Sequence, residues 1–389
     1  MLRSIIVACS ILLSASVHAA DTIKVGILHS LTGTMAISEK GVVDALNLAI
    51  DEINASGGVL GKKIVASTYD GKSDWDEFAK GAAHLIDKEK VTTIFGCWTS
   101  ASRKKVLPVV ESKNHLLWYP VQYEGMEQSP NIVYTGAAPN QQILPAVDWA
   151  LGAGNLGKNV YLVGSDYVYP RTANKMVKAY VKKTKKGKIV GESYRPLGDS
   201  NFEAIAKKIA KKKPSFIINT INGDSNIAFF EALKKNKIQN IPVISMSIAE
   251  PELKAIGKKV GLSMLEGHYA AWNYFQSLKT GENDLFVNNF KKKFGSDRVL
   301  SDPQEAAYFQ VYLFKAAVEK AGSTDTAAIR KAVKGLSYQA PEGLVTIDPK
   351  NNHTHKRVLI GKIGNDGQFQ IVHDSKSMVA PEPIPDFMK

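Results

Sequence analysis

The sequence predicts an α/β protein built as two lobes, each a mostly parallel sheet flanked by helices, with several chain crossings forming a hinge between them. Three observations lead to this prediction. Strand-like and helix-like segments alternate along the chain, an order that produces parallel sheets covered by helices. The alternation restarts after Pro139, and the chain has 389 residues, more than one compact core usually holds. The two halves are not separated by a linker rich in proline and serine.

The first half of the chain alternates strand and helix. Residues 23–28 form an apolar run typical of a buried strand. Residues 41–54 carry apolar side chains at helical spacing, and Gly57 and Gly58 then end the helix. The same patterns predict strands at residues 63–69, 91–95 and 116–119, and helices at residues 74–87 and 102–112.

The second half repeats this order. The patterns predict helices at residues 141–151, 172–182, 202–211 and 225–236, and strands at residues 160–163, 189–194, 215–220 and 243–245. From about Trp272 the chain is expected to return to the first lobe, with helices at residues 305–321 and 326–334, before a tail rich in strands and turns. We therefore assign residues 21–139 and 272–340 to lobe 1, and residues 140–271 and 341–389 to lobe 2.

The first twenty residues have the pattern of a secretory signal peptide. A positively charged start from Met1 to Arg3 precedes a short apolar core and small residues suited to cleavage, Ala19 and Ala20. The core is about half as long as a membrane-spanning helix, and no later segment reaches the roughly 18 apolar residues of one. We expect residues 1–20 to be removed and the mature chain to be a soluble periplasmic protein.

Export to an oxidising compartment makes the cysteines informative. Cys9 lies in the expected signal peptide, so only Cys97 remains and no disulfide can form within the mature chain. Cys97 follows the apolar run at residues 91–95, which favours a buried small hydrophobic residue. A catalytic thiol is the alternative, and the lack of a histidine nearby in the sequence argues against it.

The formal net charge of +13 comes largely from lysine. Arginine is scarce, and aromatic residues do not alternate with the basic runs, so the pattern does not favour a nucleic-acid surface. Solvated faces of amphipathic helices are the preferred interpretation, and weak attraction to an anionic membrane surface is the alternative. The basic clusters lie at residues 182–186, 207–208, 211–213 and 291–293.

The sequence contains no motif that identifies an enzyme or a cofactor site. Residues 152–157 spell G-x-G-x-x-G, but the dinucleotide fingerprint follows a strand and opens a helix, whereas here a helix precedes it and a strand follows. His353 and His355, in a polar turn without an accompanying cysteine, are interpreted as solvated and not as metal ligands. We expect a protein that binds its ligand without catalysis, metal or cofactor.

Uncharged polar and aromatic residues follow several of the predicted strands. In open α/β sheets, ligands bind outside the carboxyl ends of the strands. Stretches of this kind in both lobes would form two facing walls of a cleft. They lie at residues 29–33, 98–100, 119–122, 164–169, 222–224 and 247–250.

The stretch from Trp98 to Ser100 suggests how a neutral ligand is held. Ser100 is a good N-cap for the helix that follows, and the N–H groups in the first turn of that helix would point at the cleft, where they suit a carbonyl or carboxylate oxygen. Serine and threonine keep the site uncharged. Flat apolar walls would come from Trp98, Tyr119, Tyr167 and Tyr169. The alternative is that these aromatic residues belong to the core and that Ser100 only caps its helix.

Five long stretches resemble the urea-binding proteins of bacterial urea ABC transporters: GCWTSASRKKVLPVVE, LLWYPVQYEGMEQSPNIVYTGAAPNQQ, GSDYVYPRTANK, NTINGDSNIAFF and AAWNYFQS. The nearest relatives of these proteins bind short aliphatic amides, and leucine/isoleucine/valine-binding proteins are more distant. The resemblance covers essentially all of the mature chain. It implies a periplasmic binding protein fold of type I that closes on a small ligand and delivers it to a membrane permease.

The resemblance also implies which residues contact the ligand. Carried over by position, they are Trp98, Ser100, Tyr119, Val121, Tyr167 and Tyr169. Relatives that bind amides tend to have tyrosine in place of Trp98 and threonine in place of Val121. Both differences favour urea over acetamide.

We predict that urea is held by its carbonyl oxygen and its two NH₂ groups. The Ser100 turn and the backbone at Val121 would donate to the oxygen. Acceptors for the nitrogens would be Gln122, Asp224 or Glu250, and the strand-end residue Asn222 completes the predicted site. A binding protein for short amides or branched-chain amino acids is one alternative function, and a secreted hydrolase or ligand sensor is another.

Overall fold

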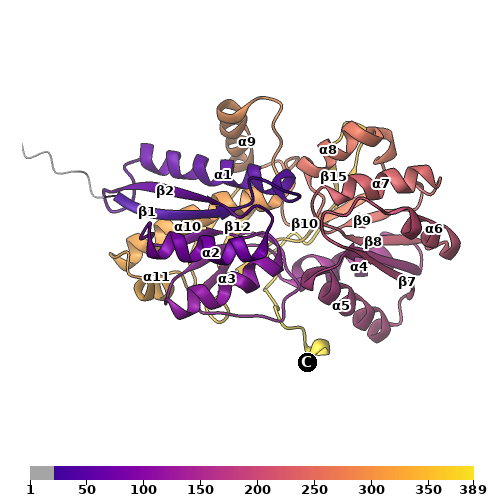
Figure 1. Cartoon of the computed structure of the whole chain (residues 1–389), viewed down its shortest axis with the longest axis horizontal. Helices are drawn as coiled ribbons and strands as arrows, with labels where there is room; N and C mark the ends of the chain where they lie inside the picture. Colours follow the sequence, from indigo (N-terminus) through magenta and orange to yellow (C-terminus); the bar gives the residue numbers. More distant parts are fainter. Residues whose placement is uncertain (1–21) are drawn as a thin grey trace, which may run out of the picture.

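The computed structural model describes residues 22–389 (Figure 1). Two α/β lobes lie side by side along the long axis of the molecule, and each contains its own sheet with helices packed against it. The expected signal peptide at residues 1–20 lies outside the described residues. Between residues 22 and 389, no helix is both long and apolar enough to cross a membrane.

Lobe 1 is built on a parallel sheet with the strand order β2-β1-β3-β4-β5. Its strands are β1 (Thr22–His29), β2 (Lys63–Asp70), β3 (Ile94–Gly96), β4 (Leu117–Tyr119) and β5 (Ile132–Tyr134). Its helices are α1 (Ala36–Ala55), α2 (Trp75–Asp87), α3 (Ser100–Ser112), α9 (Gly281–Phe294), α10 (Asp302–Ala321) and α11 (Thr326–Ala332). Helix α10 packs on α1, so the returning chain covers this lobe.

Lobe 2 contains a sheet with the order β15-β14-β10-β9-β8-β6-β7, in which only β14 and β15 are antiparallel to their neighbours. The strands are β6 (Asn159–Ser165), β7 (Lys188–Arg195), β8 (Phe216–Thr220), β9 (Val243–Ser245), β10 (Tyr269–Trp272), β14 (Leu359–Ile363) and β15 (Phe369–Asp374). The helices are α4 (Ile143–Leu151), α5 (Val168–Thr184), α6 (Glu203–Lys212), α7 (Ser225–Lys235) and α8 (Glu250–Val260).

These two lobes confirm the predicted fold class. The predicted strands and helices are present, with ends that differ by a few residues. The sequence patterns did not predict β5, β10, α8 and α9, nor the later strand β11 (Ser337–Ala340). Both short strands are largely buried, β10 between two neighbouring strands and β5 at the sheet edge beside His353, and so they lack the polar alternation that marks a half-exposed strand.

A small antiparallel sheet lies beside lobe 1 and consists of β11 (Ser337–Ala340), β12 (Gly343–Ile347) and β13 (Thr354–His355). An isolated parallel bridge joins Tyr134, in β5, to His353. The chain then enters β14 of lobe 2. The predicted lobe boundary at residue 340 stays a proposal, and this bridge favours placing it nearer residue 356.

Asn273 ties together the segments that cross between the lobes. Its side-chain amide donates to the carbonyl oxygen of Gln141 at 3.1 Å and to that of Arg357 at 2.5 Å. Its own N–H donates to Asp302 at the start of α10, at 2.8 Å. Three crossings that are far apart in the sequence therefore meet at one buried side chain, which is the geometry expected of a hinge.

The hinge region buries more acidic than basic groups. Asp302, Glu305 and Glu342 are at most 1% exposed, and Lys356 is the buried cation beside them, with its Nζ 3.1 Å from Glu342 Oε1. Burial raises the pKa of each of the three carboxyl groups, and for Glu342 it raises the pKa to about 8. One lysine cannot neutralise three carboxylates, so protonation of the acids accompanies their burial.

Two further buried glutamates stand at the first turn of α8. Glu250 accepts the N–H of Gln276 at 2.7 Å, and Glu252 accepts the hydroxyl of Ser38 in lobe 1 at 2.5 Å. Burial raises the pKa of Glu250 to about 8 and that of Glu252 to about 7. Between pH 4.5 and these values, the folded protein holds protons that the unfolded chain has released. Stability therefore falls as pH rises through this window.

The substitution Glu250→Gln should weaken this pH dependence, because glutamine keeps an oxygen for the Gln276 N–H and carries no charge. The free energy of unfolding of the wild type should fall between pH 5 and pH 8, by up to about 1.4 kcal/mol per pH unit for each such proton. Denaturant unfolding across this range measures the slope. The exposed Glu266 serves as the control, since Glu266→Gln should leave the slope unchanged. An equal slope in Glu250→Gln and wild type would contradict the assignment.

Candidate ligand-binding site between the lobes

The strands of both sheets point their carboxyl ends at the interface between the lobes, and side chains from the two lobes meet there. Trp98, which follows β3, donates its indole N–H to Asn222 Oδ1, which follows β8, at 3.4 Å. Nearby, the contact between Ser38 and Glu252 joins α1 of lobe 1 to α8 of lobe 2. The lobes are therefore closed on one another.

Aromatic side chains form the lobe 1 wall of this interface. Trp98 is 3% exposed and Tyr119 is fully buried. The Tyr119 hydroxyl donates to the Trp98 carbonyl oxygen at 2.6 Å, so the ends of β3 and β4 are tied together. Cys97 is buried, as predicted, and its left-handed backbone (φ 69°) turns the chain out of β3. Burial raises the pKa of its thiol, which fits a packing residue.

Ser100 is not the N-cap of α3, so this part of the prediction is wrong. The N-cap is Thr99, whose hydroxyl accepts the N–H of Ser102 at 3.1 Å. Ser100 is the first helical residue, and its hydroxyl donates to the Glu124 carboxylate. The first backbone hydrogen bond of the helix runs from the Arg103 N–H to the Thr99 carbonyl oxygen. The N–H groups of the first two helical residues therefore carry no intrahelical bond.

The interface is not free of charge, contrary to the expectation for this turn. Arg103 is fully buried behind Ser100 and donates to its hydroxyl oxygen at 3.1 Å. The Arg103 Nε donates to Glu127 at 2.7 Å, and its Nη2 lies 3.5 Å from Glu124 Oε1. Burial favours the neutral acid, but the charge of Arg103 prevails and lowers the pKa of Glu127 to about 2. A buried ionised cluster thus supports this wall.

His353 is not solvated, so that interpretation is also wrong. Its ring stacks on Tyr134 with centroids 4.1 Å apart, and its Nε2 lies 2.5 Å from the Tyr123 hydroxyl. The Tyr123 ring in turn lies 4.5 Å from the guanidinium carbon of Arg103. Burial lowers the pKa of His353 to about 4, so the ring is neutral near pH 7. His355 is partly exposed, and within residues 22–389 no cluster of acids, cysteines and histidines suits a metal ion.

Two tyrosines form the lobe 2 wall. Tyr167 and Tyr169, at the start of α5, are 7% and 4% exposed, and their ring centroids are 6.4 Å apart. The ring of Trp75, from lobe 1, lies 6.0 Å from that of Tyr167. Burial raises the pKa of both tyrosines, so their hydroxyl groups stay protonated and can donate.

Three buried polar atoms at this interface form no hydrogen bond of good geometry among the described residues: Gln122 Oε1, Glu124 Oε1 and the Tyr169 hydroxyl. Glu124 Oε1 lies 3.5 Å from Arg103 Nη2, and the side chains of Gln122 and Ser247 lie close to the Tyr169 hydroxyl. Gln122 is held in place because its amide nitrogen donates to the Met246 carbonyl oxygen at 2.7 Å. Buried polar atoms without partners are uncommon and unfavourable. The interface therefore suits a ligand that supplies N–H donors to two carbonyl-type acceptors and a partner for one phenol.

The remaining predicted residues lie apart from these atoms. Val121 is buried, and its backbone carbonyl lies against Gly136, where an added Cβ would come within 2.2 Å of the oxygen. Asp224 is exposed at the rim and accepts the Thr34 hydroxyl. Glu250 is buried in the hinge region, as described above. Ligand contacts by these three residues remain proposals.

The structure brings together Trp98, Ser100, Tyr119, Gln122, Tyr167, Tyr169 and Asn222. The sequence analysis missed Glu124 and Arg103, although both belong to the stretches that carry the resemblance. Both could have been recognised from the sequence as an acid and an arginine close to strand ends that are otherwise uncharged.

Replacing Arg103 by methionine should destabilise the protein by about 3–5 kcal/mol, because it leaves the buried Glu124 without a counterion and Glu127 with only the partly exposed Lys104. Lys104 provides a matched control, since it pairs with the same Glu127 at 2.9 Å but is 40% exposed. Lys104→Met should cost less than about 1 kcal/mol. Denaturant unfolding measures both values. Similar losses for the two variants would show that the buried pairing of Arg103 is not what supports the fold.

Comparison with known proteins identifies full-length relatives. The chain is 25% identical over 370 residues to the Leu/Ile/Val-binding protein homolog 6 of Brucella melitensis, and the match covers 92% of each chain.

Solved structures with the same fold include two solute-binding proteins. One is the solute-binding protein of an ABC transporter from Rhodopseudomonas palustris in complex with p-hydroxybenzoic acid, with a TM-score of 0.82, 24% identity, and coverage of 92% of this chain and 98% of the other. The second is the branched-chain amino acid transporter substrate-binding protein of Streptococcus pneumoniae in complex with isoleucine. Its TM-score is 0.79 and its identity 20%, with coverage of 93% and 100%.

A family model described as a periplasmic binding protein domain matches residues 23–389, which is nearly the whole of the described chain. The chain therefore belongs to the periplasmic binding protein family, and its two lobes have the type I fold of the solute-binding proteins of ABC transporters.

Proposed function

We propose that this protein captures urea, or another small neutral amide, between its lobes in the periplasm and delivers it to the permease of an ABC transporter. The observation that carries the proposal is a set of buried atoms that form no hydrogen bond of good geometry: Gln122 Oε1, Glu124 Oε1 and the Tyr169 hydroxyl. Two of these atoms are pure acceptors, which calls for a ligand with N–H donors on more than one side.

Urea carries the donors and the acceptor that these atoms would require. Its two NH₂ groups would donate to Glu124 and Gln122, and its carbonyl oxygen would accept from the N–H groups at the start of α3 and from Tyr169. A hydrogen bond to the Glu124 carboxylate is charge-assisted and so contributes more than a neutral one. The flat faces of Trp98 and Tyr167 would pack on the planar ligand.

An aromatic acid, of the kind bound by the Rhodopseudomonas protein, fits the charges less well. Its carboxylate could lie at the first turn of α3, but the nearest cation, Arg103, is already engaged by Glu127 and Glu124. The ligand carboxylate would also lie near the Glu124 carboxylate, and two buried negative groups repel one another.

A branched-chain amino acid is the second candidate, and one observation favours it. Glu124 could pair with an ammonium group, while the first turn of α3 could accept a carboxylate. This is also the class named for the Brucella relatives and bound in the Streptococcus structure. Urea is preferred because its extra N–H donors satisfy Gln122 as well as Glu124.

Ligand binding would stabilise the closed arrangement because the unpaired atoms become satisfied only when both lobes contact the ligand. Such preferential binding to one state is how a ligand shifts the equilibrium between open and closed forms. A hydrolase is the competing function. Incubation of the purified protein with labelled urea and acetamide separates the two, since release of ammonia at a catalytic rate would refute the binding-only proposal.

Calorimetry with urea, acetamide, leucine and 4-hydroxybenzoate tests the ligand assignment. We expect saturable binding of urea, weaker binding of acetamide, which has one NH₂ group fewer, and no binding of the aromatic acid. A site that hydrogen-bonds a group in one ligand rejects ligands that lack it, by up to about 10⁴-fold. Tight binding of leucine without binding of urea would replace this proposal by the amino-acid alternative.

The substitution Glu124→Gln should weaken urea binding by roughly tenfold or more, because it removes the charge from one acceptor. Glu266→Gln is the control: it removes the charge of an exposed acid just before the start of β10, at the edge of the sheet opposite the candidate site, and should leave the urea affinity nearly unchanged. Thermal unfolding of both variants shows whether they remain folded. An unchanged affinity in a folded Glu124→Gln variant would remove Glu124 from the site.

A further inference from the structure

The positive charge of this protein is concentrated in one part of lobe 2. Residues 141–272 contain 21 lysine and arginine residues against 10 aspartate and glutamate residues, a net charge of +11. The whole chain has a net charge of +13. About a third of the chain therefore carries most of the net charge, so the charge is distributed unevenly along the sequence.

The lysines of this part gather at the edge of the sheet where the parallel strands begin. In βαβ units, helices run opposite to the strands, so helix ends and strand starts share one edge while the ligand side lies at the other. Lys188 starts β7 and pairs with Asn159, the first residue of β6. On the other side of Asn159, its carbonyl oxygen accepts the N–H of Ser215, which directly follows the end of α6.

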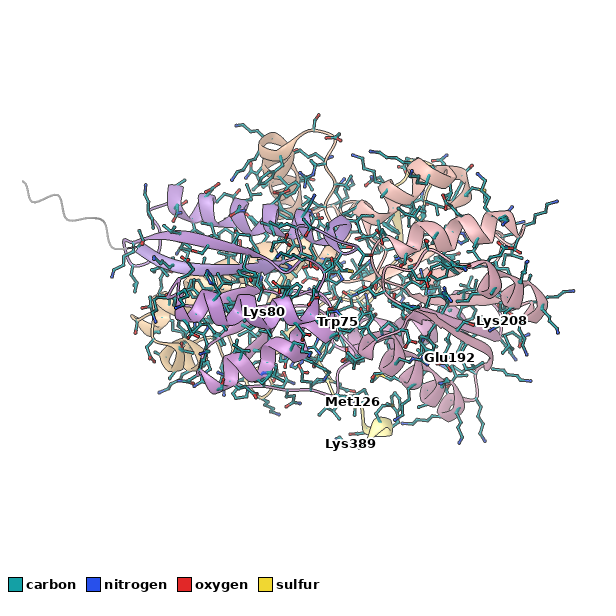
Figure 2. All side chains as sticks on the ribbon, in the orientation of Figure 1. Trp75, Lys80, Met126, Glu192, Lys208 and Lys389 are labelled. Atoms are coloured by element: carbon teal, nitrogen blue, oxygen red, sulfur yellow. The ribbon has the colours of Figure 1, made fainter. Side chains whose placement is uncertain are left out.

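We define the lysine pole as the exposed lysines at the ends of α5, α6 and α7 and at the starts of β6 and β7: Lys158, Lys182, Lys183, Lys185, Lys186, Lys188, Lys211, Lys212, Lys213, Lys234, Lys235 and Lys237. Figure 2 shows long side chains projecting from this outer end of lobe 2, near the labelled Lys208.

Most of these lysines lack a counterion. Within the part of the chain that the structure describes, only Lys186 and Lys235 of the pole form ion pairs, with Asp148 and Glu203. Lysines in the last turn of a helix stabilise it through the helix dipole. That effect does not account for Lys185 and Lys188, which lie beyond the last turn of α5, and like charges placed this close repel one another.

We propose that the lysine pole holds the protein against an anionic phospholipid surface. A flat bilayer is recognised by charge density, and clustered lysines outside any groove supply it. Specific protein interfaces are instead poor in lysine and rich in aromatic residues and arginine. Nucleic-acid surfaces combine basic residues with arginine and exposed rows of stacking aromatic residues, whereas the pole contains no arginine and its one described lysine–ring contact, Lys183 with Phe387, involves a ring that packs on Tyr180.

The position of the pole makes such binding compatible with ligand capture. The candidate ligand site lies at the carboxyl ends of the strands, and the pole lies at their opposite ends. A protein attached through the pole keeps its inter-lobe face away from the lipid and open to solvent. The attachment would keep the protein close to the membrane. It does not depend on which ligand the protein carries.

Co-sedimentation of the purified protein with vesicles tests the proposal. We expect binding to phosphatidylcholine vesicles that contain phosphatidylglycerol, little binding to phosphatidylcholine alone, and a marked loss at physiological salt, where screening acts within about 8 Å. Equal binding to both vesicle types would overturn the proposal, as would binding that is insensitive to salt.

The test variant replaces Lys211, Lys212 and Lys213 together by glutamine. The control replaces Lys291, Lys292 and Lys293, an identical run in α9 of lobe 1, and so removes the same charge elsewhere. The pole variant should bind anionic vesicles at least tenfold more weakly, since each lysine near the surface contributes roughly fivefold. The control should bind nearly as well as wild type.

Two outcomes with these variants would overturn the proposal. An equal loss in pole variant and control would mean that only the net charge matters. Binding to the permease in neutral vesicles that is lost in the pole variant alone, without any effect of lipid charge, would assign the pole to an acidic protein surface. Urea calorimetry on the same variants should be unchanged, which separates failure of this proposal from failure of the ligand assignment.

Discussion

The buried contact of Arg103 with Glu124 and Glu127 is the interaction on which the ligand side of lobe 1 depends. Removing three charges from water is unfavourable unless each is paired, and here one guanidinium lies between two carboxylates. The pairing holds the segment after β4 against the first turn of α3. These are the two segments that present Ser100 and Gln122 to lobe 2, so the geometry of the site follows from the pairing.

Periodicity in the sequence was sufficient to predict the fold, because the spacing of apolar residues records which face of each element is buried. Elements in which the apolar residues have no regular spacing were not predicted. Helix α8 carries three lysines on its exposed side, buries Glu250 and Glu252 in its first turn, and has few apolar residues, among them Leu253 and Ile256. Strand β10 is buried in the middle of its sheet, so no alternation marks it.

The site was predictable in its residues more than in its contacts. Thr99 and Ser100 are equally good N-cap types, and only the extended backbone of Thr99 decides between them. The pairing of Arg103 with Glu124 joins segments about twenty residues apart, which no local pattern reveals. His353 follows two asparagines, a polar context typical of an exposed turn, yet the return of the chain to β5 buries it.

Charged residues are arranged differently beside the candidate ligand site and at the opposite edge of lobe 2. Beside the candidate ligand site, the charged groups of lobe 1 are paired and buried, so their fields largely cancel, which suits the neutral ligand proposed above. At the opposite edge of the lobe 2 sheet, lysines that mostly lack counterions project into solvent, where their fields add. A neutral ligand would gain nothing from long-range electrostatic attraction. The lysine pole would therefore act on something other than such a ligand, and its distance from the candidate site would leave the hydrogen bonds there undisturbed.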